Sequence, residues 1–168
     1  MTADSTGTTE QPLAPTHLVD RCLAILRTKP AGLISDIDGT LSPIAATPEA
    51  ATVSDDIRAD LARLGRHMTV VGIVSGRSAP VAAAMINLPD LIYVGNHGME
   101  SLHRDEIWQN PDAAAAVTAI AEAMAEVEAA VDPDETAWLL LENKGVSASI
   151  HYRLAPDPVA AQAMLLPI

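Results

Sequence analysis

Three short apolar runs of the chain each end in small polar residues and glycine. They occupy residues 32–34, 68–74 and 91–95. Continuous apolar runs of this length are typical of strands that are buried on both faces of a parallel sheet. Helical patterns separate the runs, and a repeated order of strand, loop and helix predicts parallel strands joined by right-handed crossovers. This part of the chain therefore predicts an α/β fold with a Rossmann-like parallel sheet.

The helices of this part carry recognisable start and stop residues. Ser54 is a good cap for a helix that has acidic residues in its first turn, and Gly65 ends that helix. Another helix is predicted over about residues 78–86. A short helix capped by Thr16 precedes the first apolar run and ends before Pro30.

The pattern changes near residue 104, where an α+β unit is predicted. Asn110 caps a helix that ends at Asp132-Pro133. Two arms with alternating apolar and polar positions flank Lys144-Gly145 and predict a hairpin with one buried and one polar face. Asp157 caps a final helix. The first helix of this unit has one apolar stripe, which consists of Val117, Ile120, Met124, Val127 and Val131.

Two carboxylates, Asp36 and Asp38, follow the first apolar run in the segment DIDGT. Ligands of open α/β sheets bind outside the carboxyl ends of the strands, so polar residues there are candidates for chemistry. Alternation places both side chains on the same side, and two close like charges require a cation or a shared proton. An oxygen-seeking ion such as Mg²⁺ meets this requirement. An Asp-x-Asp pair alone is common, however, and a solvated loop would be its default interpretation.

The second apolar run ends in Ser75, Gly76 and Arg77, and this changes the interpretation of the aspartates. Two neighbouring strand ends then form one site with the chemistry of phosphoryl transfer. Asp36 fits the nucleophile, and Asp38 fits the acid/base that protonates the leaving oxygen and then activates water. The Ser75 hydroxyl and the Gly76 amide are suitable phosphate donors. Arg77 either adds positive charge or forms a structural salt bridge.

Composition narrows the range of partners. The formal net charge of −12, from 22 acidic and 10 basic residues, argues against nucleic acid and against an anionic membrane surface as the main partner. The single Cys22 excludes an internal disulfide and suits a cytoplasmic location. We expect residues 1–15 to form a polar, disordered tail rather than a secretion signal. Three glutamates interrupt the apolar segment 113–131, so we expect no membrane span.

The motifs together resemble those of a known family. DIDGT and the serine of VSGR resemble the first two motifs of the haloacid dehalogenase superfamily of phosphatases. YVGNHGME and LENKGVSASIHYR narrow the resemblance to the trehalose-6-phosphate phosphatase family, over about residues 31–156. The resemblance implies Mg²⁺-dependent hydrolysis of trehalose 6-phosphate, with Asp36 as nucleophile, Asp38 as acid/base and Ser75 as phosphate ligand. Mg²⁺ would bind the Asp36 carboxylate and the Asp38 main-chain carbonyl.

The resemblance also implies a mobile cap domain that closes over the sugar. Residues 16–103 would be the first part of the core, and residues 104–168 the amino-terminal part of the cap. The implied substrate contacts are Asn96, His97, Gly98, Glu142 and Lys144. A surface ion pair remains the alternative for the last two, and His97 is equally well explained as structural. A structural role is expected for His151, Arg153, Trp108 and Trp138.

Two pieces of the family pattern are not found in the sequence. One is a lysine that stabilises the transition state, and the other is an acidic cluster of the form G-D-D-x-T-D-E that completes the metal site. No lysine follows Lys144, and no aspartate pair follows Asp157. We therefore expect an incomplete core and a truncated cap, inactive alone, with an open sheet edge that pairs with a complementary carboxyl-terminal segment.

Two alternatives to this function remain open. The chain could serve as a catalytically inactive module that binds a sugar phosphate or pairs subunits. The same superfamily chemistry could also act on another substrate, such as sucrose phosphate or mannosylglycerate phosphate, or in a phosphomutase reaction.

Overall fold

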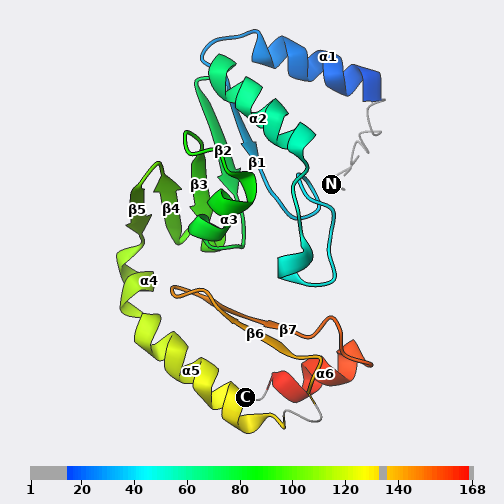
Figure 1. The fold of residues 1–168 in the computed structure, drawn as a ribbon, viewed down its shortest axis with the longest axis vertical. Helices are drawn as coiled ribbons and strands as arrows, with labels where there is room; N and C mark the ends of the chain where they lie inside the picture. Colours follow the sequence, from blue (N-terminus) through cyan, green and yellow to red (C-terminus); the bar gives the residue numbers. More distant parts are fainter. Residues whose placement is uncertain (1–14, 133–135, 167–168) are drawn as a thin grey trace, which may run out of the picture.

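A computed structural model describes residues 15–132 and 136–166 (Figure 1). Nearly all of the predicted tail, residues 1–14, lies outside the described residues. A five-stranded sheet with its helices forms the first part, which we call the core. A two-stranded sheet with three helices forms the second part, which we call the cap.

The core sheet has the strand order β1-β2-β3-β4-β5. The strands β1 (Gly32–Ser35), β2 (Val70–Val74) and β3 (Ile92–Gly95) run parallel, as the three apolar runs predict. The strands β4 (Glu100–His103) and β5 (Glu106–Gln109) continue the sheet as an antiparallel hairpin. The predicted α/β fold with a Rossmann-like parallel core is confirmed.

The β4–β5 hairpin was missed in the sequence. Its strands are short and mostly polar, and its turn at Arg104-Asp105 places a non-glycine residue, Arg104, in the left-handed region with φ 56°. The predicted boundary near residue 104 falls inside this turn, whereas the core sheet ends at Gln109. The division into core and cap at residue 104 therefore cuts through one hydrogen-bonded ladder.

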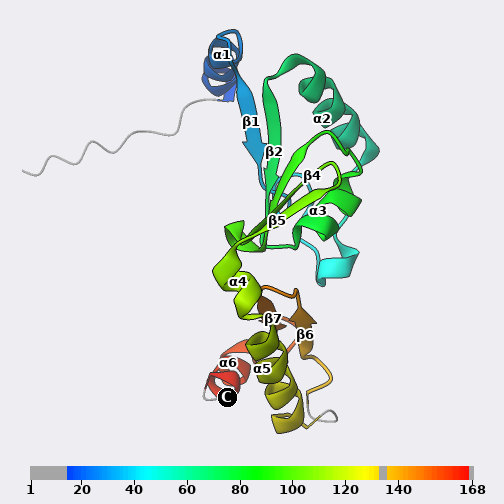
Figure 2. The same ribbon diagram turned by 90° about the vertical axis from the view of Figure 1, so that its left-hand side faces the viewer.

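Two helices, α2 (Asp55–His67) and α3 (Ala79–Ile86), cover one face of the core sheet (Figure 2). The predicted cap of α2 is present, because the Ser54 hydroxyl accepts a hydrogen bond from the Ile57 amide at 3.4 Å. Apolar burial between this sheet face and the helices stabilises the core. Its fully buried large side chains include Ile37, Ile73, Ile86 and Tyr93.

The other face of β1 and β2 is open, which corrects the prediction of strands buried on both faces. β1 is an edge strand, and Ile34 on its open face is 71% exposed. Val70 and Val74 of β2 share this face and are also exposed. An apolar run shows that a strand is able to be buried on both faces. Whether a face is buried depends on whether another element packs against it. No described helix covers Ile34.

The helix α1 (Pro15–Leu26) begins at Pro15, so the predicted cap Thr16 already lies within it. Its predicted apolar side, at Leu18, Cys22 and Ile25, is exposed. A short 3-10 turn, η1 (Pro48–Ala50), lies in the long loop that follows β1.

The cap consists of α4 (Pro111–Ala115), α5 (Val117–Ala130), the hairpin β6 (Leu140–Asn143) and β7 (Ala148–His151), and α6 (Pro158–Leu165). The hairpin lies between the core and the helices α5 and α6 (Figures 1 and 2). The hairpin and the final helix, capped by the Asp157 carboxylate, agree with the sequence prediction. The single long helix does not, because it is broken at Ala116. None of the described helices has the length and apolar character needed to cross a membrane.

A buried glutamate fixes the start of α3, directly after the loop that carries Ser75, Gly76 and Arg77. The α3 cap residue Ser78 makes no side-chain cap hydrogen bond. Glu100 from β4 replaces it, because its Oε1 accepts from the Ala79 amide at 2.7 Å and its Oε2 accepts from Gln109 Nε2 at 3.3 Å. β3 approaches the same point closely, since a Cβ on Gly95 would lie 2.2 Å from the Ala79 nitrogen. The loop before α3 is therefore held by both neighbouring strands.

Replacing Glu100 with alanine should destabilise the core. The substitution leaves the buried Ala79 amide without its acceptor, so we expect the free energy of unfolding to fall by about 1–3 kcal/mol. Urea denaturation followed by circular dichroism measures this loss. Glu100→Gln keeps an acceptor oxygen and should lose less. Glu106→Ala, at an exposed glutamate of β5, is the matched control, and an equal loss at both positions would contradict the capping role.

Candidate functional site

The two predicted catalytic aspartates lie on either side of a buried anchor at the end of β1. Ile37 is fully buried, and its carbonyl accepts from the amides of Thr40, Leu41 and Ser42 in a tight turn. Asp36 and Asp38 are exposed, as alternation predicts. Within the described residues, the Asp36 carboxylate has no hydrogen-bond or ion-pair partner.

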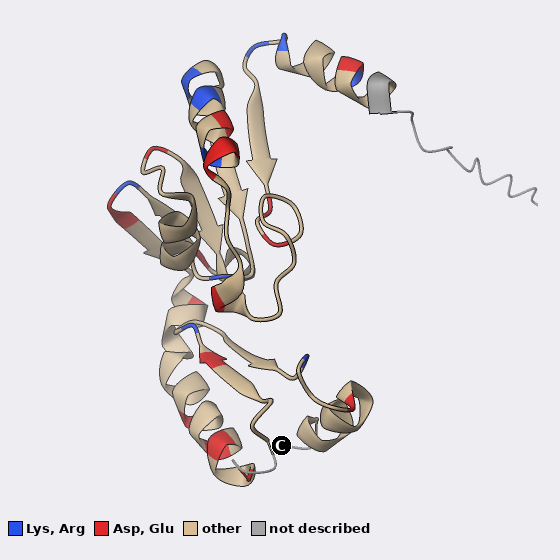
Figure 3. Cartoon of the chain, turned by 45° about the vertical axis from the view of Figure 1, so that its right-hand side comes forward, with Lys and Arg blue, Asp and Glu red and all other residues tan. Residues whose placement is uncertain are grey.

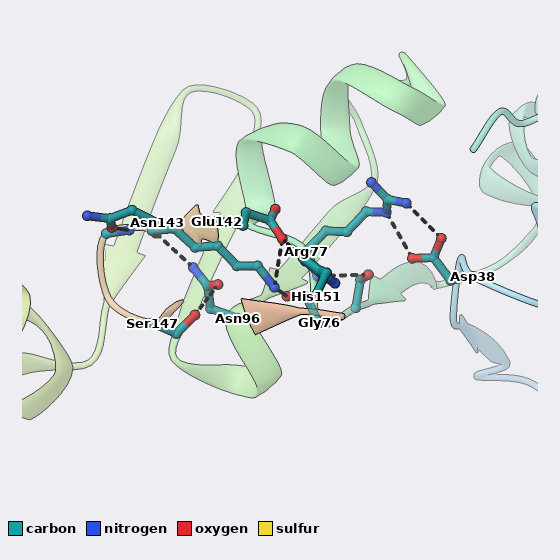
Figure 4. A network of polar contacts seen from close by, with 11 residues as sticks. Asp38, Gly76, Arg77, Asn96, Glu142, Asn143, Ser147 and His151 are labelled. Atoms are coloured by element: carbon teal, nitrogen blue, oxygen red, sulfur yellow. Dashed lines mark hydrogen bonds and ion pairs between the residues drawn. The ribbon is translucent and has the colours of Figure 1, made fainter. Parts of the chain in front are cut away.

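Asp38 is held by Arg77 from the neighbouring strand end. Arg77 Nε and Nη2 donate to the two carboxylate oxygens of Asp38, each at 2.8 Å (Figure 4). Such a bidentate pair is among the stronger hydrogen-bonded contacts between side chains. The hydrogen bond to Asp38 raises the pKa of Arg77 above its ordinary value. The sequence left two alternatives for Arg77, and in this structure it forms the salt bridge.

The other predicted phosphate ligands lie in the loop before Arg77. Ser75 is buried, and its hydroxyl oxygen accepts from the Arg77 amide at 3.2 Å. Gly76 packs against the ring of His97, because a Cβ on Gly76 would lie 2.7 Å from His97 Cε1. Only a residue without a side chain fits there unless the ring moves.

The loop η2 (Asn96–Gly98) connects the core to the cap hairpin through Asn96. This side chain is fully buried, its Oδ1 accepts from the Ser147 hydroxyl at 2.7 Å, and its Nδ2 donates to the Lys144 carbonyl at 3.4 Å (Figure 4). The predicted substrate contact of Asn96 does not fit this arrangement, since both polar atoms already bind the hairpin turn. His97 and Gly98 are exposed and both adopt positive φ.

Lys144 also crosses from the cap to the core. Its Nζ donates to the Gly76 carbonyl at 3.0 Å and lies 3.5 Å from Glu142 Oε2. The Lys144 side chain is only 8% exposed. The alternative of a plain surface ion pair with Glu142 therefore does not describe it. Glu142 has a second partner in His151, with 2.8 Å between Oε2 and Nε2.

A cavity of about 300 Å³ lies between the strand ends of the core and the cap hairpin. Four predicted site residues line it, namely Asp38, Gly76, Arg77 and Glu142. The other predicted residues are not part of its lining: Asp36, Ser75, Asn96, His97, Gly98 and Lys144. The loop after β1 forms a further wall through Ile44, Ala45, Ala46, Thr47 and Pro48.

One face of the cap hairpin supplies a further part of the lining that the sequence motifs did not identify. Trp138, Leu140 and Glu142 occur at every second position and all line the cavity, as do His151 and Arg153 on the second arm. The alternation that predicted the hairpin contained part of this signal, because His151 and Arg153 occupy its predicted polar face, whereas Trp138 and Leu140 are apolar. Arg153 Nη1 also donates to the Ala45 carbonyl at 3.0 Å. The prediction of a structural role for His151, Arg153 and Trp138 is therefore incomplete, because all three also line the cavity.

The two tryptophans differ in their surroundings, although both were expected in the cap core. Trp108 lies on β5 of the core sheet and is 53% exposed, so that prediction is wrong. Trp138 lines the cavity.

Positive charge near the cavity is sparse. Acidic side chains predominate on α5, and α2 carries both signs (Figure 3). The arginines that line the cavity are Arg77 and Arg153. An anionic ligand in this acidic chain would therefore be attracted locally rather than by the net charge.

The predicted metal ligands fit an ion that keeps most of its water. No group of three or more His, Cys, Asp or Glu side chains in the described ranges is arranged to hold a metal. Mg²⁺ commonly uses one or two carboxylates together with waters and substrate phosphate. The unpartnered Asp36 carboxylate has the right donor chemistry and exposure for that mode of binding.

The parallel sheet with strand-end aspartates, joined to an α+β cap, is the architecture of a haloacid dehalogenase-like protein. The family model described as trehalose-phosphatase matches residues 34–166, and the chain belongs to this family. Among solved structures, the C-terminal domain of C. albicans trehalose-6-phosphate phosphatase superposes with a TM-score of 0.70 at 22% identity, covering 94% of this chain and 54% of that one. A trehalose-6-phosphate phosphatase related protein gives a TM-score of 0.61 at 19% identity, covering 82% and 60%. At these identities the likeness shows the fold.

The matches to curated relatives cover most of this chain but only part of each relative's length. The trehalose-phosphate phosphatase of Mycobacterium tuberculosis is 32% identical over 121 residues, which are 71% of this chain and 30% of the relative. An uncharacterized glycosyl hydrolase of the same species is 35% identical over 123 residues, which are 73% of this chain and 9% of that protein. A probable trehalose-phosphate phosphatase of Sinorhizobium fredii is 30% identical over 128 residues, or 74% and 46%. The chain thus spans less than half the length of these relatives.

The contact between Asn96 and Ser147 predicts an energetic coupling between core and cap. In a double-mutant cycle of Asn96→Ala and Ser147→Ala, we expect a coupling energy of about 0.5–3 kcal/mol, because the two side chains are direct partners. Chemical denaturation of the four proteins measures it. Asn96→Ala combined with Ser149→Ala, a serine of β7 that has no hydrogen bond to Asn96, is the control and should be additive. Additive losses in both cycles would contradict the coupling.

Proposed function

We propose that this chain supplies the nucleophile and the sugar-binding face of a Mg²⁺-dependent phosphatase that hydrolyses trehalose 6-phosphate. Membership of the trehalose-phosphatase family supports the reaction class. The main structural support is the cavity that joins Asp38 and Arg77 to the polar face of the cap hairpin. A charged strand-end wall suits a phosphate, and a hairpin with carboxylate, imidazole and guanidinium groups suits sugar hydroxyls.

The two aspartates divide the chemistry. The Asp36 carboxylate attacks phosphorus, the bond from phosphorus to the sugar oxygen breaks, and Asp38 donates a proton to that oxygen. Asp38 then removes a proton from water as the water oxygen attacks phosphorus, the bond between phosphorus and Asp36 breaks, and phosphate is released. Mg²⁺, when held by Asp36 and the Asp38 carbonyl, would neutralise charge on the transferred group. Asp38 must leave Arg77 for this task, and an incoming phosphate competes for the same guanidinium.

The cap residues read the sugar and hold the phosphate loop. Glu142 faces the cavity and accepts hydrogen bonds from sugar hydroxyls, while His151 and Lys144 orient its carboxylate. Lys144 also fixes the Gly76 carbonyl, so cap closure and loop geometry are coupled. We assign Asn96 a positioning role in this coupling, in place of a substrate contact.

The 168-residue chain by itself should bind sugar phosphate but turn over poorly. Its two lysines are Lys29 and Lys144, and the latter is engaged by Gly76 and Glu142. Loss of a single electrostatic donor typically costs roughly 10²–10³ in rate. A complementary carboxyl-terminal segment with a lysine and further acidic ligands would restore turnover. The proposed location is the cytoplasm.

The decisive test of the reaction is an assay of phosphate release from trehalose 6-phosphate. The protein assayed contains this chain, followed by the carboxyl-terminal part of a full-length relative. We expect release that requires Mg²⁺ and is lost on chelation with EDTA. Asp36→Asn should lower kcat by at least roughly 10³, because an amide does not attack phosphorus. Asp56→Asn, at an exposed aspartate in the first turn of α2, is the matched control and should retain full activity. Undiminished release by Asp36→Asn would refute the proposal.

A binding-only function is the second candidate, and the bidentate pair between Asp38 and Arg77 favours it, since that pair occupies the proposed acid/base. Isothermal titration calorimetry of the 168-residue chain with trehalose 6-phosphate distinguishes the two when combined with the release assay. Stoichiometric binding with no release by any longer form would favour binding alone. A panel that includes sucrose 6-phosphate and mannosylglycerate phosphate tests the substrate.

A further inference from the structure

The loop η2 has an unusual backbone. Asn96, His97 and Gly98 are three consecutive residues with positive φ, at 49°, 57° and 95°. Glycine adopts this region freely, whereas a residue with a side chain is strained there and keeps the conformation only where its surroundings enforce it. Residues strained in this way cluster at functional sites. The contacts of His97 therefore indicate what its conformation supports.

His97 contacts the loop of residues 75–77 in two ways. Its backbone amide donates to the Ser75 carbonyl at 3.3 Å. Its ring lies beside Gly76, since a Cβ on Gly76 would be 2.7 Å from Cε1 and 3.0 Å from Nε2 of that ring. The left-handed conformation of His97 thus brings both its amide and its ring onto two consecutive residues of this loop.

The hydrogen bond to the Ser75 carbonyl sets the direction of the next amide. The C=O and the N–H of a planar trans peptide point in opposite directions. Because the Ser75 carbonyl is bound to the His97 amide, the Gly76 N–H points away from η2. Within the described part of the chain this N–H donates no hydrogen bond. Gly76 lines the cavity and His97 does not, so a residue outside the cavity orients an unused donor of its lining.

We propose that His97 is a positioning residue for phosphate binding, which holds Ser75 and Gly76 so that the Gly76 N–H stays free to donate to a phosphate oxygen. This inference rests on the proposed function and deepens it. The amide of His97 fixes the peptide plane, and its ring fills the space beside Gly76 and opposes rotation of that plane. His97 therefore acts through Gly76 and takes no part in contacting the sugar phosphate itself.

Titration with inorganic phosphate, followed by ¹H–¹⁵N NMR of the 168-residue chain, tests this role. We expect the Gly76 amide resonance to shift in a saturable way with phosphate, and not with chloride at equal ionic strength. His97→Val should raise the Kd for phosphate roughly 10-fold, because a β-branched residue avoids the left-handed region and the bond to the Ser75 carbonyl is lost. His97→Asn tolerates that region and keeps the amide, so its Kd should lie in between.

A purely structural role of His97 gives a different result. Its variants would then unfold at lower temperature, but the folded protein would keep the original Kd and the original Gly76 resonance, and this would overturn the inference. The His97→Asn comparison decides even if His97→Val does not fold. His103→Val, at an exposed histidine of β4, is the matched control and should leave the Kd unchanged.

Phosphate binding also separates this inference from the proposed function. If phosphate causes no shift of the Gly76 resonance in the unsubstituted chain, the inference is wrong. If phosphate binds as expected but the longer protein does not hydrolyse trehalose 6-phosphate, only the proposed function is refuted.

Discussion

The arrangement of the site depends on a small group of hydrogen bonds that join the cap hairpin to the core. Asn96 binds the Ser147 hydroxyl and the Lys144 carbonyl, and Lys144 Nζ returns to the Gly76 carbonyl. Because the Asn96 side chain is fully buried, leaving either of its polar atoms without a partner would be costly. They fix the position of the hairpin turn relative to the strand ends. The width of the cavity follows from that position.

The same contacts couple the loop of Ser75, Gly76 and Arg77 to the rest of the fold. Gly76 has His97 on one side and Lys144 on its carbonyl, and the following helix α3 is capped by Glu100. The Gly76 carbonyl is thus bound to the hairpin through Lys144, whereas the start of α3 is bound to β4 through Glu100. The loop is therefore supported by two different parts of the fold.

Much of the fold was predictable because its signals are local. The three apolar runs, the Ser54 cap and the hairpin around Lys144-Gly145 each depend on a few neighbouring residues, and all agree with the structure. The β4–β5 hairpin and the break at Ala116 carry no strong local signal. The open face of Ile34 could not be predicted, since burial depends on what packs there. For the same reason a motif identified Asn96 but not its contact with Ser147, which is far away in the sequence.

The chain has few aromatic residues, and one of them, Trp138, lies in the cavity wall instead of in the hydrophobic core. With two tryptophans, two tyrosines and no phenylalanine, the core is filled by aliphatic side chains and by Tyr93. The large aromatic surface of Trp138 is not needed to fill that core, and it lines the cavity instead. The lining also carries the guanidinium groups of Arg77 and Arg153, within a chain whose net charge is −12. The cavity thus combines charged groups with aromatic and aliphatic surface in its lining, and a ligand that matches both kinds of group would be oriented by the difference between them.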